Sequence, residues 1–545
     1  MGKAARRRHA NDGENDSGKA LRNGSSYHSR GDRHSGTTES PAGLSPLKLC
    51  LLVVTVATGG LVAAYFLNED AQSVIHSTLL HYGIPDFLQF TGSNPAEDAG
   101  QREQTQRQPK KTSYTKSSIT NSADKKIRSE LDDADSYREK GQIEKAMEKY
   151  NAILKRYPKS PRALYGKAEN LDKLAEKKQS NTYLEEAIQT FLTVLDLENV
   201  PDDLVIQTGR RAAERMNFRG WSAKAVKTLR GLTQRFPQNV ALKNELGVAY
   251  LMVGKTEEAR PVFKAALEID PKNGFALVHL GFIYKTADND PAKAIPLLRE
   301  GINTKAEGTV DGRFYFHLGD SLQRVGQKEE AYEVYKAGAD LGLFLSMYQR
   351  SLYNVDHLTG RPWWTPEQTT YKKYLKLLED NWKVIRDEGL AQMDLKSGAF
   401  LPEEENLREK GDWKQFTLYQ RGQKNKKNCQ KVPKTCALID QIPAAKGCKR
   451  GQVKYSVMQP GVHVWPHCGP TNCRIRAHLG LVVPDGPRIS VAGQEGKWVE
   501  GKFIIFDDSF EHEVWHDGNS FRLVLIVDFW HPELSDHEKA NLSPI

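Results

Sequence analysis

The run VHVWPHCGPTNCRIRAHLGL, residues 462–481, contains VHVWPH (462–467) and most of RAHLGLVV (476–483), two of the short β-prone segments that set the fold class of the last third of the chain. The other segments are QVKYSVM (452–458), KFIIF (502–506), EVW (513–515) and FRLVLIVDF (521–529). Glycine and proline separate them, and several short strands at close spacing favour a sandwich or jelly roll. We therefore expect an all-β domain over residues 401–545.

A helical pattern with an internal period precedes the β-rich part. LGVAY begins at Leu246 and LGFIY at Leu280, which is 34 residues later (280 − 246). This is the period of tetratricopeptide repeats, in which pairs of antiparallel helices stack into a superhelix. Residues 128–345 are thus predicted to form an all-α repeat array whose concave face is a binding hypothesis. Residues 346–400 should form a helical connector.

An uncharged run, LCLLVVTVATGGLVAAYFL at residues 49–67, is long enough to cross a hydrocarbon core of about 30 Å. A cleaved signal peptide is the alternative, but the polar segment before the run is too long for the start of such a peptide. Basic residues lie on its N-terminal side and acidic residues follow it. The positive-inside rule then predicts a single-pass type II signal-anchor with a lumenal C-terminal part.

Two polar segments flank this predicted transmembrane helix. Residues 1–48 contain few apolar side chains and should form a disordered cytosolic tail. Residues 68–127 read as a lumenal stem and polar linker. The formal net charge is +9, and basic residues cluster locally in these segments, as at positions 6–8 and 110–116, without the regular aromatic interleaving typical of single-strand binders. We therefore expect no nucleic-acid partner.

The cysteine pattern fits an oxidising lumen. Cys429 and Cys436 bracket a short loop that contains a proline, so they are the best candidates for a disulfide. A zinc knuckle is the alternative, but no second close Cys/His pair completes four ligands. Cys448, Cys468 and Cys473 have no assigned partner.

Two histidines and an arginine in the C-terminal segments suggest a catalytic centre. His467 and His512 come from separate predicted strands, and Arg522 follows His512 by ten residues (522 − 512). Neutral imidazole suits Fe(II), and a buried arginine can hold a carboxylate through two parallel hydrogen bonds. An Fe(II)/2-oxoglutarate oxygenase needs this combination, although either histidine alone is equally well explained as a core residue.

The runs WPHCGPTNCRIRAHLGL (465–481) and FDDSFEHEVW (506–515) resemble aspartyl/asparaginyl β-hydroxylases, which are Fe(II)/2-oxoglutarate-dependent peptide-aspartate β-dioxygenases. The resemblance implies a double-stranded β-helix. It also implies hydroxylation of the β-carbon of Asp or Asn in EGF-like domains, coupled to conversion of 2-oxoglutarate and O₂ to succinate and CO₂. Such substrates agree with a lumenal catalytic domain, which we expect at the endoplasmic reticulum membrane.

The resemblance also assigns roles to individual residues. It implies that His467 and His512 hold the iron, and that Gly469 stands where related enzymes place an acidic ligand, so that water fills this position. It implies co-substrate contacts from Trp413, Ser456, Arg476, His478 and Arg522. Its substrate-side residues are Arg474, Asp508, Gln415, Gln452 and Lys454. It further implies that Cys429 and Cys436 form a disulfide.

Two other functions compete with this prediction. One is a membrane-tethered, non-catalytic repeat scaffold with a degenerate oxygenase-like binding domain, against which the intact histidines and arginines argue. The other is an oxygenase that acts on a different residue or on a small molecule. The sequence does not distinguish Asp from Asn as the preferred target.

Overall fold

The computed structural model describes residues 114–393, 399–403 and 405–545, all within the second of two compact units, residues 57–545. The predicted cytosolic tail and transmembrane run lie outside these residues, as does most of the stem. Among the described helices, none combines the length and apolar character that a membrane crossing requires.

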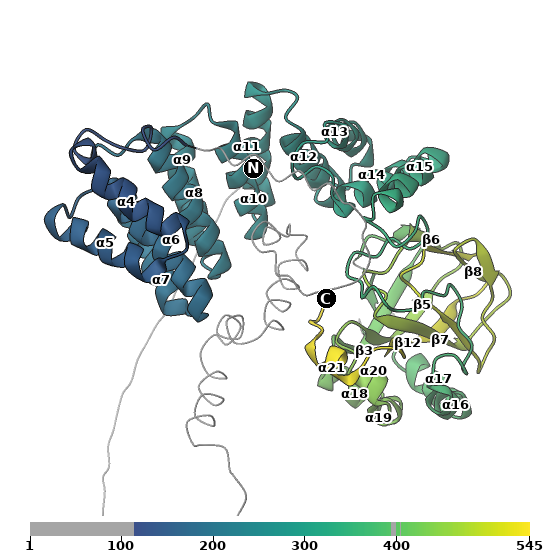
Figure 1. Cartoon of the computed structure of the whole chain (residues 1–545). Helices are drawn as coiled ribbons and strands as arrows, with labels where there is room; N and C mark the ends of the chain where they lie inside the picture. The colour runs from purple at the N-terminus through teal and green to yellow at the C-terminus, as the bar shows by residue number, and fades with distance from the viewer. Residues whose placement is uncertain (1–113, 394–398, 404) are drawn as a thin grey trace, which may run out of the picture. The chain divides into compact units, whose positions relative to one another are not determined.

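Twelve consecutive α-helices follow the short 3-10 helix η2 (Asp124–Ile127) (Figure 1). They are α4 (Arg128–Glu139), α5 (Ile143–Arg156), α6 (Pro161–Lys178), α7 (Asn181–Leu195), α8 (Asp202–Phe218), α9 (Ser222–Arg235), α10 (Val240–Met252), α11 (Thr256–Ile269), α12 (Gly274–Thr286), α13 (Pro291–Asn303), α14 (Gly312–Arg324) and α15 (Lys328–Asp340). Successive helices contact each other along the whole series. The predicted helical-repeat region is confirmed.

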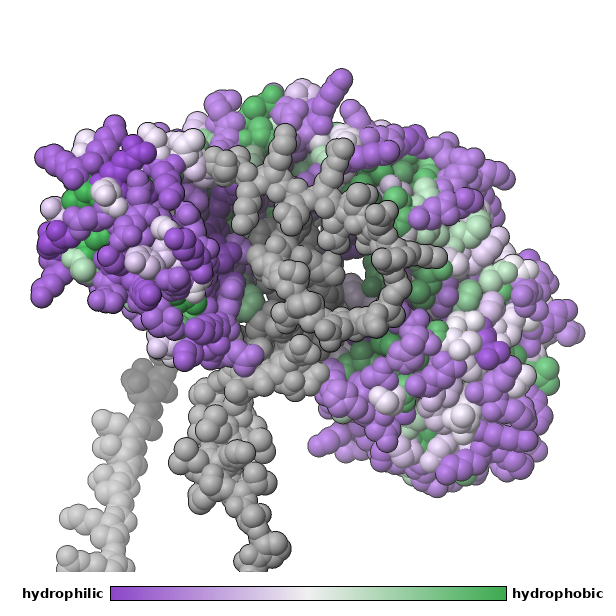
Figure 2. All heavy atoms as spheres, in the orientation of Figure 1, coloured by the Kyte–Doolittle hydropathy of each residue, from purple (hydrophilic) through white to green (hydrophobic). Residues whose placement is uncertain are grey.

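Close contact between a glycine and a large side chain of the paired helix explains the repeat motif, and in two pairs that side chain is aromatic. A Cβ atom added to Gly247 of α10 would lie 2.5 Å from the Phe263 ring of α11. Gly319 of α14 meets Tyr335 of α15 in the same way. The small residue therefore lets the paired helices approach, while the aromatic ring fills the space between them. Hydrophilic side chains cover most of the visible face of α4–α7 (Figure 2).

The folded region begins before the predicted repeat boundary. Residues 114–127, expected to be linker, include η2. The Asp124 carboxylate accepts a hydrogen bond from the Arg162 backbone N–H at 3.1 Å, and Thr120 accepts one from the Arg162 guanidinium at 3.1 Å. Long-range hydrogen bonds to Arg162 therefore tie this segment to α6, and local composition does not reveal them.

The β-rich domain consists of two antiparallel sheets. The larger has the order β1-β3-β5-β12-β7-β10, with β4 paired to β3, and the smaller has the order β2-β6-β11-β8-β9. The larger contains β1 (Leu401–Pro402), β3 (Trp413–Gln420), β4 (Gln423–Lys424), β5 (Gln452–Met458), β7 (Arg474–Val482), β10 (Phe503–Phe506) and β12 (Arg522–Trp530). The smaller contains β2 (Arg408–Lys410), β6 (His463–His467), β8 (Pro487–Val491), β9 (Gln494–Gly496) and β11 (His512–His516). A β-rich C-terminal domain is therefore confirmed.

Helices cover one face of the larger sheet. The predicted connector contains α16 (Lys372–Asp380) and α17 (Trp382–Leu390), while α18 (Lys426–Lys431), α19 (Pro433–Asp440) and α20 (Pro443–Lys446) lie between β4 and β5 in the chain. Their apolar side chains form one buried cluster with Leu523, Leu525 and Val527 of β12. The other face of the sheet packs on the smaller sheet. The last helix in sequence order is α21 (Asp536–Asn541).

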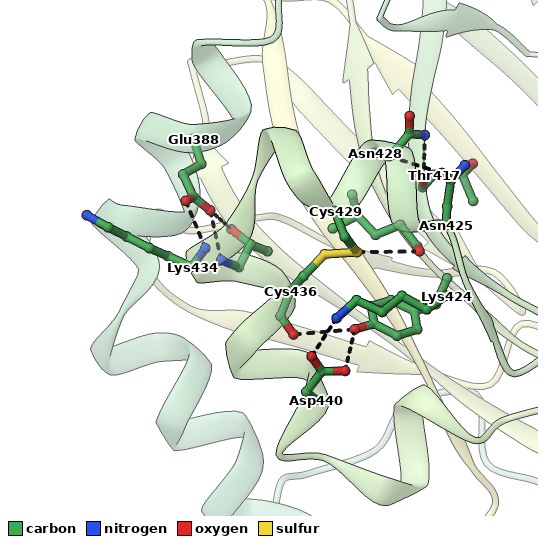
Figure 3. The surroundings of a disulfide bond; sticks show 12 residues. Glu388, Thr417, Lys424, Asn425, Asn428, Cys429, Lys434, Cys436 and Asp440 are labelled. Carbon is green, nitrogen blue, oxygen red and sulfur yellow. Dashed lines mark hydrogen bonds and ion pairs between the residues drawn. A yellow bond between two sulfur atoms is a disulfide. The ribbon is translucent and has the colours of Figure 1, made fainter. Parts of the chain in front are cut away.

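The structure joins Cys429 of α18 to Cys436 of α19 by a disulfide, with their Cα atoms 5.6 Å apart (Figure 3). Nearby, the Asp440 carboxylate accepts hydrogen bonds from the Tyr419 hydroxyl at 2.8 Å and from the Lys424 ammonium at 2.6 Å. The disulfide thus fastens two short helices beside the larger sheet. Among the described residues Cys448, Cys468 and Cys473 are free thiols.

Candidate active site

A cavity with an internal volume of about 100 Å³ lies between the two sheets. It brings together all the candidate site residues except the two disulfide cysteines. These residues are Trp413, Gln415, Gln452, Lys454, Ser456, His467, Arg474, Arg476, His478, Asp508, His512 and Arg522. Residues far apart in sequence therefore contribute to a single site.

Strand alternation explains why so many polar side chains meet here. Along β12, Val524 and Ile526 belong to the apolar cluster between the sheets, whereas Leu523 and Leu525 belong to the cluster under the helices. Arg522 lies two residues before Val524, so its side chain points to the same face of the sheet and projects into the cavity. The cavity residues of β3, β5 and β7 are likewise spaced two apart along their strands.

His467 and His512 are direct partners on the neighbouring strands β6 and β11, and their ring centroids are 4.0 Å apart. His467 Nδ1 lies 2.7 Å from the carbonyl oxygen of Trp465, and His512 Nδ1 lies 2.9 Å from that of Phe510. Because a carbonyl oxygen only accepts hydrogen bonds, each Nδ1 carries the proton and each Nε2 keeps its lone pair. Burial lowers the pKa of both imidazoles, and His467 lowers that of His512 further.

Asp508 occupies the space that a side chain at position 469 would need, and the resemblance places the missing acidic ligand at this position. A Cβ atom added to Gly469 would lie 2.5 Å from Asp508 Oδ2, and the Gly469 N–H donates to the Asp508 carbonyl oxygen at 2.5 Å. Within the described ranges, no group of three or more His, Cys, Asp or Glu side chains is arranged to hold a metal. Two imidazole lone pairs in one buried cavity nevertheless fit an Fe(II) ion that completes its coordination with water or small ligands.

Arg522 supplies a buried positive charge at the same cavity. Its side chain is 1% exposed, and its Nη2 donates to Ser456 Oγ at 3.3 Å. In the part of the chain that the structure describes, Arg522 forms no ion pair with a carboxylate and its Nε has no hydrogen-bond partner. Burial lowers its pKa to about 9, so it remains a cation at neutral pH. An unpaired buried cation is costly, and an anionic ligand would remove that cost.

Arg474 and Arg476 differ from Arg522 because buried carboxylates hold both of them. Arg474 Nη2 lies 2.6 Å from Asp508 Oδ2, and Arg476 Nε lies 2.8 Å from Asp528 Oδ1. Burial alone would raise the pKa of Asp508, but Arg474 and Arg476 outweigh it and hold this pKa below its usual range. The two predicted substrate residues, Arg474 and Asp508, therefore form an ion pair with each other.

Lys454 and the two predicted glutamines complete the polar lining. Lys454 Nζ donates to Gln415 Oε1 at 2.7 Å, and burial lowers the pKa of Lys454 to about 8. The Gln452 backbone N–H donates to Asp528 Oδ2 at 3.0 Å. These contacts place several donors and acceptors on one wall of the cavity.

Two residues that contact the cavity lining, Asp528 and Trp498, are not among those predicted from the sequence. Asp528 interrupts the apolar run LVLIVDFW of β12 and lies on the same face of the strand as Arg522. A charged residue within such a run could have indicated a polar site on that face. Trp498 follows β9 in a segment with no strand of its own, and no sequence pattern singles it out. The structure brings its indole against both His478 and Arg522.

Comparisons with known proteins agree with this geometry. Residues 379–532 match the model of the aspartyl/asparaginyl β-hydroxylase family, and residues 134–160 and 219–274 match tetratricopeptide repeat models. The resemblance expected from the sequence is thereby confirmed for the β-rich domain, and the repeat assignment is confirmed for the helical region.

Curated relatives extend the similarity beyond the β-rich domain. The chain is 52% identical over 439 residues to aspartyl/asparaginyl β-hydroxylase of Homo sapiens, covering 80% of this chain and 58% of the relative. The Mus musculus protein of that name is 53% identical, covering 79% and 58%. Aspartate β-hydroxylase domain-containing protein 2 of Xenopus tropicalis is 29% identical, covering 54% and 78%. The chain thus spans a little over half the length of the first two relatives.

Proposed function

We propose that this chain, whose residues 379–532 match the aspartyl/asparaginyl β-hydroxylase family, hydroxylates the β-carbon of Asp or Asn side chains in polypeptides. The proposed reaction uses Fe(II), 2-oxoglutarate and O₂ and yields succinate and CO₂. One observation carries the proposal. A single cavity contains two imidazoles with available Nε2 lone pairs and a buried arginine without a carboxylate partner in the described chain.

One set of residues would bind the metal and another would bind the co-substrate. Nε2 of His467 and Nε2 of His512 would hold the iron, which supplies the oxidising chemistry when bound. Arg522 and the Ser456 hydroxyl would bind the distal carboxylate of 2-oxoglutarate. Ser456 Oγ already accepts from Trp413 Nε1 at 2.9 Å and from Arg522, so its own proton is available to a carboxylate. The dicarboxylate would thereby neutralise the buried guanidinium.

The Arg474–Asp508 pair would meet the polypeptide. Asp508 orients the Arg474 guanidinium, which also donates to the Arg450 carbonyl oxygen at 2.6 Å. A substrate carboxylate or carboxamide would share this guanidinium with Asp508, while Gln415 and Lys454 offer further polar contacts. The protein's part in the chemistry is then to orient the target side chain and to exclude water.

The proposed substrates are EGF-like domains of secreted and membrane proteins, and the proposed location is the endoplasmic reticulum membrane. The apolar run at residues 49–67, which lies outside the described residues, supports a type II anchor. The disulfide between Cys429 and Cys436 supports an oxidising compartment for the catalytic domain. Protease protection of membrane vesicles tests this topology, because a lumenal β-rich domain resists digestion until detergent is added.

The competing scaffold function accounts poorly for the cavity. His478 Nε2 and Arg522 Nε are buried without a partner within the described residues. Each unsatisfied buried polar group costs about 1–3 kcal/mol. A binding module that had lost its chemistry would gain stability by replacing such groups.

Mass spectrometry of an EGF-like domain tests the proposal. The purified full chain is incubated with the domain, Fe(II), 2-oxoglutarate and O₂, and a His467→Ala variant serves as the matched control. We expect the mass gain of one oxygen on an Asp or Asn residue, accompanied by an equal amount of succinate. Succinate formed without any oxygen gain would contradict the substrate class, and absence of both products would contradict the enzymatic function.

A further inference from the structure

Three histidines line the cavity, and the partner of Nδ1 divides them into two kinds. At His467 and His512 the partner is a backbone carbonyl oxygen, which forces the proton onto Nδ1. At His478 the partner is Trp498, whose indole Nε1 lies 3.3 Å from His478 Nδ1. The two rings of that pair are nearly parallel, with an interplanar angle of 10° and centroids 6.1 Å apart.

The chemistry of the indole determines the tautomer of His478. An indole N–H can only donate, so His478 Nδ1 must accept and cannot carry a proton. The imidazole is therefore neutral, and its proton resides on Nε2. This tautomer is the opposite of the one at His467 and His512.

The protonated nitrogen of His478 is available to a ligand. Among the described residues, Nε2 of His478 is buried and has no hydrogen-bond partner, although the side chain lines the cavity. Because Nε2 carries a proton, it has no lone pair for a metal, but it can donate to an anion. This explains how a cavity with three histidines can present only two metal-ligating imidazoles.

The same indole also contacts Arg522. The guanidinium carbon of Arg522 lies 4.5 Å from the centre of a Trp498 ring. Among the described residues that line the cavity, Arg522 Nε is the second buried donor without a partner, after His478 Nε2. Trp498 is itself 4% exposed and packs in the apolar cluster between the sheets. The Trp498 side chain therefore contacts both residues, His478 and Arg522, whose two buried donors have no partner among the described residues.

We propose that Trp498 is a positioning residue for the co-substrate. Its N–H holds His478 as the Nε2–H tautomer and its ring orients the Arg522 guanidinium, so that both donors face the carboxylates of a bound 2-oxo dicarboxylic acid. The identity of this anion rests on the proposed function. The tautomer of His478 does not depend on the proposed function, so a separate experiment measures it.

Trp498→Phe removes the indole N–H while keeping an aromatic ring against Arg522. Trp515→Phe makes the same chemical change at a side chain that stacks on His463, with ring centroids 5.7 Å apart, and is the matched control. Two-dimensional ¹⁵N–¹H spectra of the full chain with ¹⁵N-labelled histidine report the tautomer of each ring. A His478→Gln sample identifies the His478 signals.

The spectra of the metal-free, ligand-free wild type should show His478 protonated at Nε2 alone. Trp498→Phe should convert this signal to the Nδ1–H form or to a mixture, and Trp515→Phe should leave it unchanged. Protonation at Nδ1 in the wild type, or an unchanged Nε2–H signal in Trp498→Phe, would overturn the proposal. The wild-type spectrum decides the tautomer even if Trp498→Phe folds poorly.

Binding of 2-oxoglutarate in the absence of O₂ provides the second measurement. Loss of one well-placed neutral hydrogen bond should weaken 2-oxoglutarate binding by about 2- to 12-fold in Trp498→Phe, with Fe(II) affinity unchanged. Unchanged 2-oxoglutarate affinity would refute the positioning role. Failure of the wild type to bind 2-oxoglutarate would instead refute the proposed function, with the tautomer assignment still standing on the spectra.

Discussion

Replacing Glu511 by alanine should lower the free energy of unfolding by about 3–5 kcal/mol, the usual cost of removing one partner from a buried ion pair. The Glu511 carboxylate accepts hydrogen bonds from Arg350 Nη2 at 2.7 Å and from Gln323 Nε2 at 3.0 Å, and it also accepts from the Tyr332 hydroxyl. Arg350 is 1% exposed, and Glu511 is its only carboxylate partner among the described residues. Alanine at position 511 would leave this guanidinium charged and buried.

Equilibrium unfolding in urea, followed by tryptophan fluorescence, measures this loss. The control is Glu495→Ala, because the Glu495 side chain is 62% exposed and lies 3.8 Å from Arg488, a pair expected to contribute less than about 1 kcal/mol. A double variant, Arg350→Met with Glu511→Leu, removes both charges and should recover part of the loss. A decrease below about 1 kcal/mol in Glu511→Ala would refute the importance of this pair.

Four other changes test the site and its support. His467→Ala should abolish iron binding in equilibrium dialysis without changing the far-ultraviolet circular dichroism, and wild-type iron retention would contradict the ligand assignment. Arg522→Ala should weaken 2-oxoglutarate binding, measured by calorimetry, by about 10- to 150-fold, since hydrogen bonds to charged groups contribute about 1.5–3 kcal/mol; equal affinity would exclude Arg522 as the anion site. Gly469→Asp should reduce hydroxylation, because its Cβ would lie 2.5 Å from Asp508 Oδ2, and full activity with tighter iron binding would disprove this steric argument. A chain starting at residue 346 keeps every candidate ligand but loses two of the three Glu511 partners, so it should bind iron yet unfold at lower urea concentration; an unchanged midpoint would show that the repeats do not stabilise the site.

Local patterns made much of the architecture predictable. The 34-residue spacing of LGVAY and LGFIY reflects a close helix–helix contact that recurs along the helical region, in which Gly247 meets the Phe263 ring and Gly281 meets Leu298. The β-prone runs anticipated β5, β7 and β12, because one or both faces of each strand are buried, whereas β3 and β8 were not predicted. Strand parity also accounts for the shared direction of Arg474, Arg476 and His478.

By itself the sequence determined which residues are available to the site, the helical repeats and the β-rich domain, since these depend on spacings between residues close together in the chain. Only the tertiary structure decided what each buried polar atom bonds to. It paired Arg474 with Asp508 and gave His478 the opposite tautomer from His467. The physical reason is that a buried donor or acceptor takes its protonation and orientation from whichever group the fold brings within about 3 Å, and that group can lie anywhere in the chain.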